Sequence, residues 1–404
     1  PDTPNRITPT LSYGAKVKLE LNLDQNFDLD RREADDLSTV RPSVELAFTF
    51  QPHEQFEAFV NFELKREIAV TEEDGDSDRP TQLDLDQAYF MVENLVDDLT
   101  LQVGRQEFDD DREWLYDQEI DAVRVFYELF DVDIELSASR EQIVDRDLLN
   151  LDRGNRINNY IAYAEYELVD DDDGHRFLEE VNLAAYAIFR DDREDDDNDP
   201  LFLGVRSIGE FLDGLEYWAD FGLVRGRDGS EHIRAYGFDV GGTYEFDLEY
   251  EPYVTLGYAF GSGDGNPDDG TDREFRQTGL HDNSGKFGGV TSFGYYGELF
   301  DPELSNMSIL TAGVGLRPLE NTSLDLVYHR YWQDELDDEL RDVKVEEDLT
   351  GSHKALGEEV DLVFGYSSDS GLSFELVLGY FRPGRAYEHR DDALFVNSEL
   401  TYEF

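Results

Sequence analysis

The chain has 404 residues, of which 34 are lysine or arginine and 95 are aspartate or glutamate, giving a formal net charge of −61. This balance excludes a nucleic-acid-binding protein, because phosphate contacts need a cationic surface. It also argues against docking on anionic lipid through a basic patch. Zero cysteines exclude disulfides, thiolate metal sites and cysteine nucleophiles. The 27 phenylalanines and 22 tyrosines predict a folded chain.

Hydropathy does not exclude a membrane protein. No stretch approaches the ~18 uncharged apolar residues of a transmembrane helix, and a β-barrel leaves no such stretch because half of every strand faces water. No charged-then-apolar leader precedes Pro1. If the chain is a barrel, we expect it to be a mature form from which a signal peptide has been removed.

Apolar and polar residues alternate with a period of two along most of the chain. In the first segment, 13–27, Val17 and Leu19 share one face while Lys16 and Lys18 share the other. A membrane-spanning strand with one lipid face and one wet face requires this alternation over about ten residues. The pattern therefore predicts transmembrane β-strands and not helices.

The same pattern recurs in chain order to the carboxy-terminal residue. The further segments are 41–50, 56–65, 83–93, 98–108, 119–129, 131–144, 157–169, 177–190, 200–211, 214–226, 232–248, 251–262, 307–317, 321–333, 358–368, 371–382 and 393–404. The total of about 18 is even, as closure of a single-chain bacterial barrel demands. The predicted fold is all-β: one closed antiparallel transmembrane barrel, forming a single domain over residues 1–404.

The connectors between these segments alternate in length. Short ones such as 51–54 and 368–371 have the composition of tight periplasmic turns. Long ones predict external loops, and they are 70–82, 145–156, 263–306 and 334–357. Because connector 263–306 is so long, we expect it to fold into the barrel mouth as a pore constriction or plug.

Several connectors are intensely acidic, notably residues 170–173 and 191–199. Solvation of the surface explains such runs, and calcium bridging is the alternative. We expect no other cofactor. The acidity of the whole surface is also what a protein from a saline habitat would have.

Two stretches resemble the alginate export family of outer-membrane proteins. The first is Gly104-Arg105-Gln106, followed by 110–117 and 119–125, and the second is the 32-residue block 275–306. The resemblance implies a monomeric barrel of the same strand number that passes an anionic polyuronate to the exterior, beside a periplasmic scaffold of helical repeats. It places the chain in the outer membrane of a Gram-negative bacterium.

A polyuronate carries one carboxylate per sugar, so a narrow pore must replace its lost hydration with fixed cations. Parity places the basic residues of the first three strands on the wet face. Arg105 shares the parity of Leu101 and Val103, which would aim it at lipid unless it lies at a bulge or at the rim; the resemblance places it in the lumen. The candidate pore residues are Lys16, Lys18, Arg41, Lys65, Arg105, Arg124, Arg276 and Lys286, with Glu63 and Asp239 as counter-charges. Ordinary salt bridges to wall carboxylates are the alternative for each cation.

An enzyme is the competing class. Acidic pairs could serve a glycosidase, but 95 acidic residues guarantee some pair at suitable spacing. No two histidines have helical metal-ligand spacing, and no GxSxG, HExxH or P-loop motif is present. We therefore predict a channel and not an enzyme. A porin for small anionic sugars or organic acids is the nearer alternative, and a purely structural anchor is a third.

Overall fold

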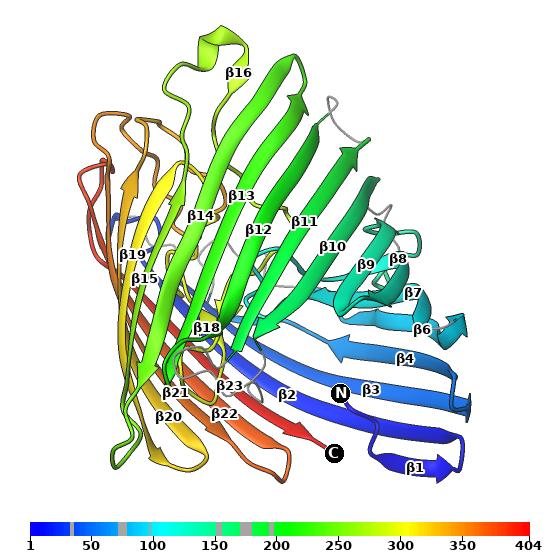
Figure 1. Ribbon diagram of the computed structural model, residues 1–404. Coiled ribbons are helices and arrows are strands. Elements are labelled where there is room, and N and C mark those ends of the chain that lie inside the picture. Colours follow the sequence, from blue (N-terminus) through cyan, green and yellow to red (C-terminus); the bar gives the residue numbers. More distant parts are fainter. Residues whose placement is uncertain (33–35, 72–78, 97, 151–155, 170–179, 194–197) are drawn as a thin grey trace.

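The computed structural model describes all residues except 33–35, 72–78, 97, 151–155, 170–179 and 194–197. Within the described residues, eighteen strands of nine to seventeen residues form one antiparallel sheet that closes on itself. Closure comes from the pairing of β2 with the last strand, β23, so the two ends of the chain lie side by side (Figure 1). The predicted barrel and its strand number are confirmed.

Each long strand pairs with its neighbours in the chain, apart from short interruptions. The long strands are β2 (Leu11–Gln25), β3 (Leu37–His53), β4 (Phe56–Lys65), β6 (Gln82–Val96), β7 (Leu99–Asp109), β8 (Asp117–Leu129), β9 (Val132–Arg140), β10 (Ile157–Val169), β11 (Glu180–Asp192), β12 (Asp199–Glu210), β13 (Leu215–Asp228), β14 (Glu231–Glu245), β15 (Tyr253–Gly261), β19 (Met307–Leu319), β20 (Thr322–Gln333), β21 (Ala355–Ser367), β22 (Leu372–Pro383) and β23 (Ala393–Glu403).

Five shorter strands and one turn of 3-10 helix complete the described elements. They are β1 (Asn5–Thr8), β5 (Ile68–Thr71), β16 (Thr271–Asp272), β17 (Ser284–Gly285), β18 (Phe293–Gly294) and η2 (Pro267–Asp269). Sequence alternation did not predict them, because two to four residues are too few to define a period. None of the described residues forms a helix long and apolar enough to span a bilayer.

The outer surface of the barrel is apolar. On β2, Val17, Leu19, Leu21 and Leu23 are each 40–44% exposed, and every other long strand except β7 contributes exposed leucine, valine, tyrosine or phenylalanine side chains to this surface. A continuous exposed apolar belt of this extent is stable only against hydrocarbon. The alternation that predicted the strands therefore also sets their facing, with apolar side chains toward lipid and polar ones inward.

The barrel interior is not uniformly wet. After β15 the chain first runs along the loop-end rim, where β16 pairs with β14, and the part that contains β17 and β18 then folds inside the ring (Figure 1). It reaches deep: Gly288 accepts a hydrogen bond from Arg317 near the short-turn end. We call residues 263–306 the plug. The sequence predicted a wet tunnel, whereas part of the lumen holds a packed core, because the plug carries its own aromatic residues inward.

Candidate functional site

The lumen has two unlike walls. The first, here called the open wall, is formed by the inner faces of β2, β3, β4, β6 and β23. Its lysine and arginine side chains pair with carboxylates on the same or adjacent strands. The pairs are Lys16–Glu45 at 3.2 Å, Lys18–Glu399 at 3.3 Å, Arg41–Glu20 at 3.1 Å, Lys65–Glu63 at 2.7 Å and Lys65–Asp84 at 2.8 Å.

In most of these pairs the side chain of the cation is more exposed to the lumen than that of the carboxylate. The Lys16 side chain is 29% exposed and that of Glu45 is 12%. For Arg41 and Glu20 the values are 36% and 12%. Lys65 and its partners follow the same order, while Lys18 and Glu399 reverse it. A solute in the lumen therefore meets ammonium and guanidinium groups first, with their counter-charges behind them.

A cavity of about 420 Å³ lies against the open wall and is lined by Lys18, Glu20, Arg41, Glu63 and Lys65, together with residues of the loop that follows β4. Arg79 from that loop pairs with Glu67 at 2.9 Å, and Glu67 also holds Arg41. The cavity is thus bordered by alternating charges. Each cation that lines the cavity therefore has a carboxylate neighbour.

The second wall, here called the covered wall, is the inner face of β11 to β15 and β19 to β22, against which the plug packs. A second inward segment, residues 110–116 between β7 and β8, joins it there. Arg112 of that segment donates to Asp239 of β14 at 2.9 Å and lies over the rings of Trp218 and Tyr295 at 4.0 and 4.2 Å. Burial makes this cation–carboxylate contact a fixed structural link.

Asp239 is the centre of this attachment. Besides Arg112 it accepts hydrogen bonds from Trp218 Nε1 at 2.9 Å and from the hydroxyl of Tyr296 at 3.2 Å. It is 2% exposed. Arg206 of β12 makes a second link between the wall and the inward segment. It donates hydrogen bonds to Asp220 on β13 and to Asp110 of the inward segment. Asp239 and Asp220 are therefore buried and hold the plug and the inward segment against the wall.

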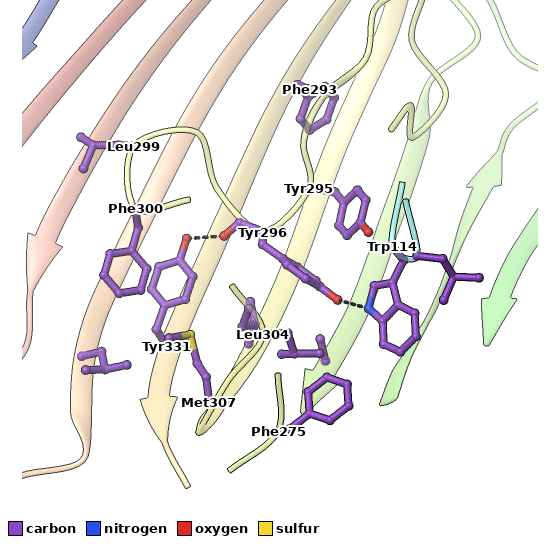
Figure 2. Packing of buried hydrophobic residues seen from close by; sticks show 14 of the residues in the cluster. Trp114, Phe275, Phe293, Tyr295, Tyr296, Leu299, Phe300, Leu304, Met307 and Tyr331 are labelled. Carbon is purple, nitrogen blue, oxygen red and sulfur yellow. Dashed lines mark hydrogen bonds between the residues drawn. The ribbon is translucent and has the colours of Figure 1, made fainter. Parts of the chain in front are cut away.

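Aromatic packing completes the attachment, as Figure 2 shows. Trp114 donates from Nε1 to the hydroxyl of Tyr296 at 3.1 Å, and the hydroxyl of Tyr331 on β20 donates to the backbone oxygen of Tyr296 at 2.7 Å. Phe275 stacks beside Trp114. A Cβ added to Gly237 of β14 would lie 2.7 Å from the Phe275 ring, so this wall position admits the plug because it is glycine.

Backbone amides of the plug are also tied to the wall. The amides of Leu299 and Phe300 donate to the carboxylate of Glu359 at 2.7 and 3.0 Å. Within the plug itself, desolvation raises the pKa of Glu298 and that of Glu303 to about 7 in each case. Both carboxyl groups accept a backbone amide bond, from Gly294 and Gln277. Burial thus brings the pKa of two plug carboxyl groups close to neutrality.

The structure separates the residues predicted to line the pore. Lys16, Lys18, Arg41, Lys65 and Glu63 lie together on the open wall. Asp239 faces the lumen but is covered by the plug, as described above. Lys286, on the plug, is exposed, whereas its neighbour Phe287 stacks on Trp218 of the covered wall. Within the described part of the chain Lys286 forms no ion pair.

The remaining three predicted arginines lie apart from the open wall. Arg124 faces inward but is buried beneath Phe108, with its guanidinium 2.7 Å from Glu135. Arg276 pairs with Asp228 and Asp272 and fastens the upper part of the plug. Each is thus held in place by fixed carboxylate partners.

Arg105 keeps the parity of Val103 and so belongs to the outer face, opposite Asp121 in the β7–β8 register. It is 3% exposed, because residues 143–148 fold over it. Its guanidinium makes two hydrogen bonds to Asp121 and donates to the backbone oxygens of Leu85 and Val144. Parity had left open a bulge or a position at the rim, and the structure shows the rim; Arg105 does not lie in the lumen, where the resemblance had placed it.

The residues of segment 110–116 were not among the predicted site residues, and in the sequence they stood out only as part of a motif. Arg112 and Trp114 serve the covered wall through partners 127 and 182 positions away. Their signal in the sequence was a tryptophan two positions after an arginine, in a connector too short to be an independent unit. No period or spacing indicates where such side chains point.

Three carboxylates gather where the inward segment meets the plug: Glu113, Asp117 and Asp282 bring oxygen atoms within 4.8 Å of one another. Desolvation, with repulsion from the two aspartates, raises the pKa of Glu113 to about 8. Proton uptake by Glu113 thus relieves the repulsion. The acidic run 170–173 and the centre of the run 191–199 lie outside the described residues. The structure therefore gives no distances with which to assess calcium binding there.

A closed antiparallel barrel with a lipid-facing belt and a charged lumen defines the class: an outer-membrane β-barrel protein of Gram-negative bacteria. Solved structures of porin-like barrels share this fold. OccAB4 of Acinetobacter baumannii aligns with TM-score 0.61 and 9% identity over 99% of this chain and all of that chain. OccK11 (OpdR) of Pseudomonas aeruginosa aligns with TM-score 0.57 and 15% identity over 98% and 95%.

The sequence model of the alginate export family matches residues 10–398, and the chain belongs to that family. The alginate production protein AlgE of Pseudomonas aeruginosa is 29% identical over 223 residues, which are 46% of this chain and 44% of that protein. AlgE of Azotobacter vinelandii is 28% identical over 160 residues, 34% and 33% of the two chains. The chain thus spans less than half the length of the curated relatives it matches.

Proposed function

We propose that the protein is a channel that exports an alginate-like polyuronate across the outer membrane along the open wall. Membership of the alginate export family and the AlgE relatives support the substrate class. The order of charge on the open wall supports the mechanism: the cations of Lys16, Arg41 and Lys65 stand in front of their carboxylates. On this proposal the protein is a transporter and not an enzyme.

The cations replace hydration that the polymer loses in the pore. Each lysine or arginine also keeps a carboxylate neighbour, so a uronate group must compete with that neighbour and leaves again easily. Lys286 adds an exposed cation on the surface of the plug. A polymer moving between the open wall and Lys286 would thus pass a series of weak sites, which conduction requires.

The plug then has a defined role as a constriction. It closes the covered half of the lumen and confines passage to the side where cations are exposed. Attachment through buried groups such as Asp239 and Glu359 supports a plug that stays in place during transport. Arg124 and Arg276, which the sequence placed in the pore, would act by holding this arrangement.

Charge selectivity in planar bilayers tests the proposal. An inner variant replaces the four lumenal lysines with glutamate: K16E, K18E, K65E and K286E. Under a salt gradient the wild type should show a reversal potential of the anion-selective sign, and the inner variant should reverse that sign. The same reversal potential in both proteins would contradict the proposal.

The alternative, a porin for small anionic sugars or organic acids, is supported by the fold shared with porin-like barrels. Liposomes separate the two. Export of a polymer predicts passage or pore block by uronate oligomers of increasing length, with a neutral oligosaccharide of equal length as the control. Passage of the monomer with exclusion of every longer oligomer would favour the alternative.

Several finer properties stay proposals. A monomer and a periplasmic scaffold of helical repeats are what the family resemblance implies, and detergent mass measurement and co-purification test them. Calcium binding at acidic connectors would raise the melting temperature when calcium is added in place of magnesium. An origin in a saline habitat would fit a net charge of −61 and predicts greater stability in molar salt.

A further inference from the structure

Although the whole chain is strongly acidic, one region of its outer face is cationic. Four exposed arginines border a cavity of about 520 Å³ at the loop end of β20, β21 and β22. We call them the arginine patch; they are Arg330, Arg382, Arg385 and Arg390. The overall charge had argued against such a basic patch, and the local distribution corrects that expectation.

The patch faces outward, toward the membrane and not the lumen. Arg330 follows the parity of Leu326, a belt residue that is 47% exposed, and Arg382 follows that of Tyr380, which is 41% exposed. The intervening residues His329 and Phe381 are buried inside the barrel. The wall therefore separates Arg330 and Arg382 from any solute in the pore, and Arg385 and Arg390 border the same cavity from the loop after β22.

The strands fix the position of the arginine patch along the barrel axis. β20 runs from the short turn before Thr322 to Gln333, so Arg330 and Trp332 lie near its loop end. Arg330 sits over the Trp332 ring at 5.0 Å. An aromatic ring beside cations, directly above the last belt residues, is typical of the interface between hydrocarbon and headgroups.

The patch lacks enough counter-charge of its own. Within the described part of the chain, Arg382 is the one member that forms an ion pair, with Glu358 at 3.0 Å. The nearby carboxylate of Asp392 is engaged by the hydroxyl of Tyr380. Arg330, Arg385 and Arg390 thus present guanidinium groups without carboxylate partners around one cavity.

A second place on the same rim shows the same deficit. Arg225 of β13 and Arg234 of β14 lie directly opposite each other in the register, and both are exposed. Like charges directly opposite each other on adjacent strands are destabilising. An anion at this height would offset that repulsion, as it would at the arginine patch.

We propose that the arginine patch binds the phosphate groups of a phosphorylated glycolipid in the outer leaflet, with its acyl chains on the apolar belt below. Arginine matches phosphate with paired hydrogen bonds, and clustered cations beside a bilayer recognise anionic headgroups. The position at the edge of the lipid belt favours a lipid over the transported polymer. This inference depends on the membrane orientation and not on the proposed transport.

Native mass spectrometry of the detergent-purified protein tests it with bisphosphorylated lipid A as the probe and dephosphorylated lipid A as its control. The outer variant carries R330Q, R382Q, R385Q and R390Q. The matched neutral inner variant carries K16Q, K18Q, K65Q and K286Q, which remove the same number of charges from the lumen. Heat-modifiable gel mobility checks that both variants fold.

The outer variant should bind the phosphorylated lipid with affinity lower by about tenfold or more and keep its reversal potential. The neutral inner variant should keep the lipid affinity and change its reversal potential. A milder double variant, R385Q with R390Q, leaves the strands untouched and should lose affinity several-fold. Unchanged affinity in the outer and double variants, equal affinity for the dephosphorylated lipid, or displacement of the lipid by uronate oligomers would each overturn the proposal.

Discussion

The open and covered walls both contain cations paired with carboxylates, but these pairs have different roles on the two walls. On the open wall, Lys65 pairs with Glu63 while 22% of its side chain stays exposed to the lumen. On the covered wall, Arg112 and Asp239 are nearly inaccessible. Exposed pairs add little stability and can exchange partners, whereas a buried pair cannot lose one member without a large cost. Burial, more than residue type, therefore separates the groups that can meet a solute from those that hold the plug.

The largest effect we expect comes from breaking the covered wall. Asp239→Ala removes the acceptor of Arg112, Trp218 and Tyr296, leaving a buried cation unpaired. We expect the free energy of unfolding to fall by about 3–5 kcal/mol. Urea unfolding measures this, and protease cleavage within residues 263–306 reports release of the plug. A fall below about 1 kcal/mol would show that this pair is not what holds the plug.

A change of pH should act on the plug in a defined direction. The pKa values of Glu298 and Glu303, about 7 in the folded protein, are raised above the ordinary value of 4.5. Between those values the folded protein holds more protons, so plug stability falls as pH rises through this window. Fluorescence of Trp114 and Trp218 during heating should show a lower transition at pH 8 than at pH 5.

The control for that experiment is the double variant with Glu298→Gln and Glu303→Gln. Glutamine stays neutral at both pH values, so the difference between the two transitions should shrink. An equal difference in variant and wild type would assign the pH dependence to other groups.

The smallest effect should come from the open wall. Glu20→Ala removes one partner of Arg41, which keeps Glu67 at 2.5 Å. The expected loss in urea unfolding is at most about 1 kcal/mol, since the pair is partly exposed and solvent screens it. A loss as large as that of Asp239→Ala would remove the distinction between the walls.

The sequence predicted what depends on local alternation. The barrel, the long strands and the inward facing of Lys16, Lys18, Arg41 and Lys65 all follow from a period of two, because adjacent side chains on a strand must point to opposite faces. The contacts of the plug could not be predicted in this way. Arg112 finds Asp239 across 127 residues, and no local pattern encodes that distance.

Arg105 and the arginine patch show two further limits. Parity placed Arg105 on the outer face correctly, but its burial depends on residues 143–148, which belong to a loop. The patch gathers arginines from two strands and one loop, and the net charge of the chain conceals it. Properties that arise where separate segments meet need the three-dimensional arrangement.

Passage along one side of the lumen is the central claim, and cysteine accessibility measures it directly because the chain has no cysteine. Single variants Lys18→Cys on the open wall and Val327→Cys on the covered wall are treated with a membrane-impermeant anionic thiol reagent in proteoliposomes. We predict rapid reaction at position 18 and protection at position 327, which is 1% exposed. Equal reaction rates at the two positions would contradict the account.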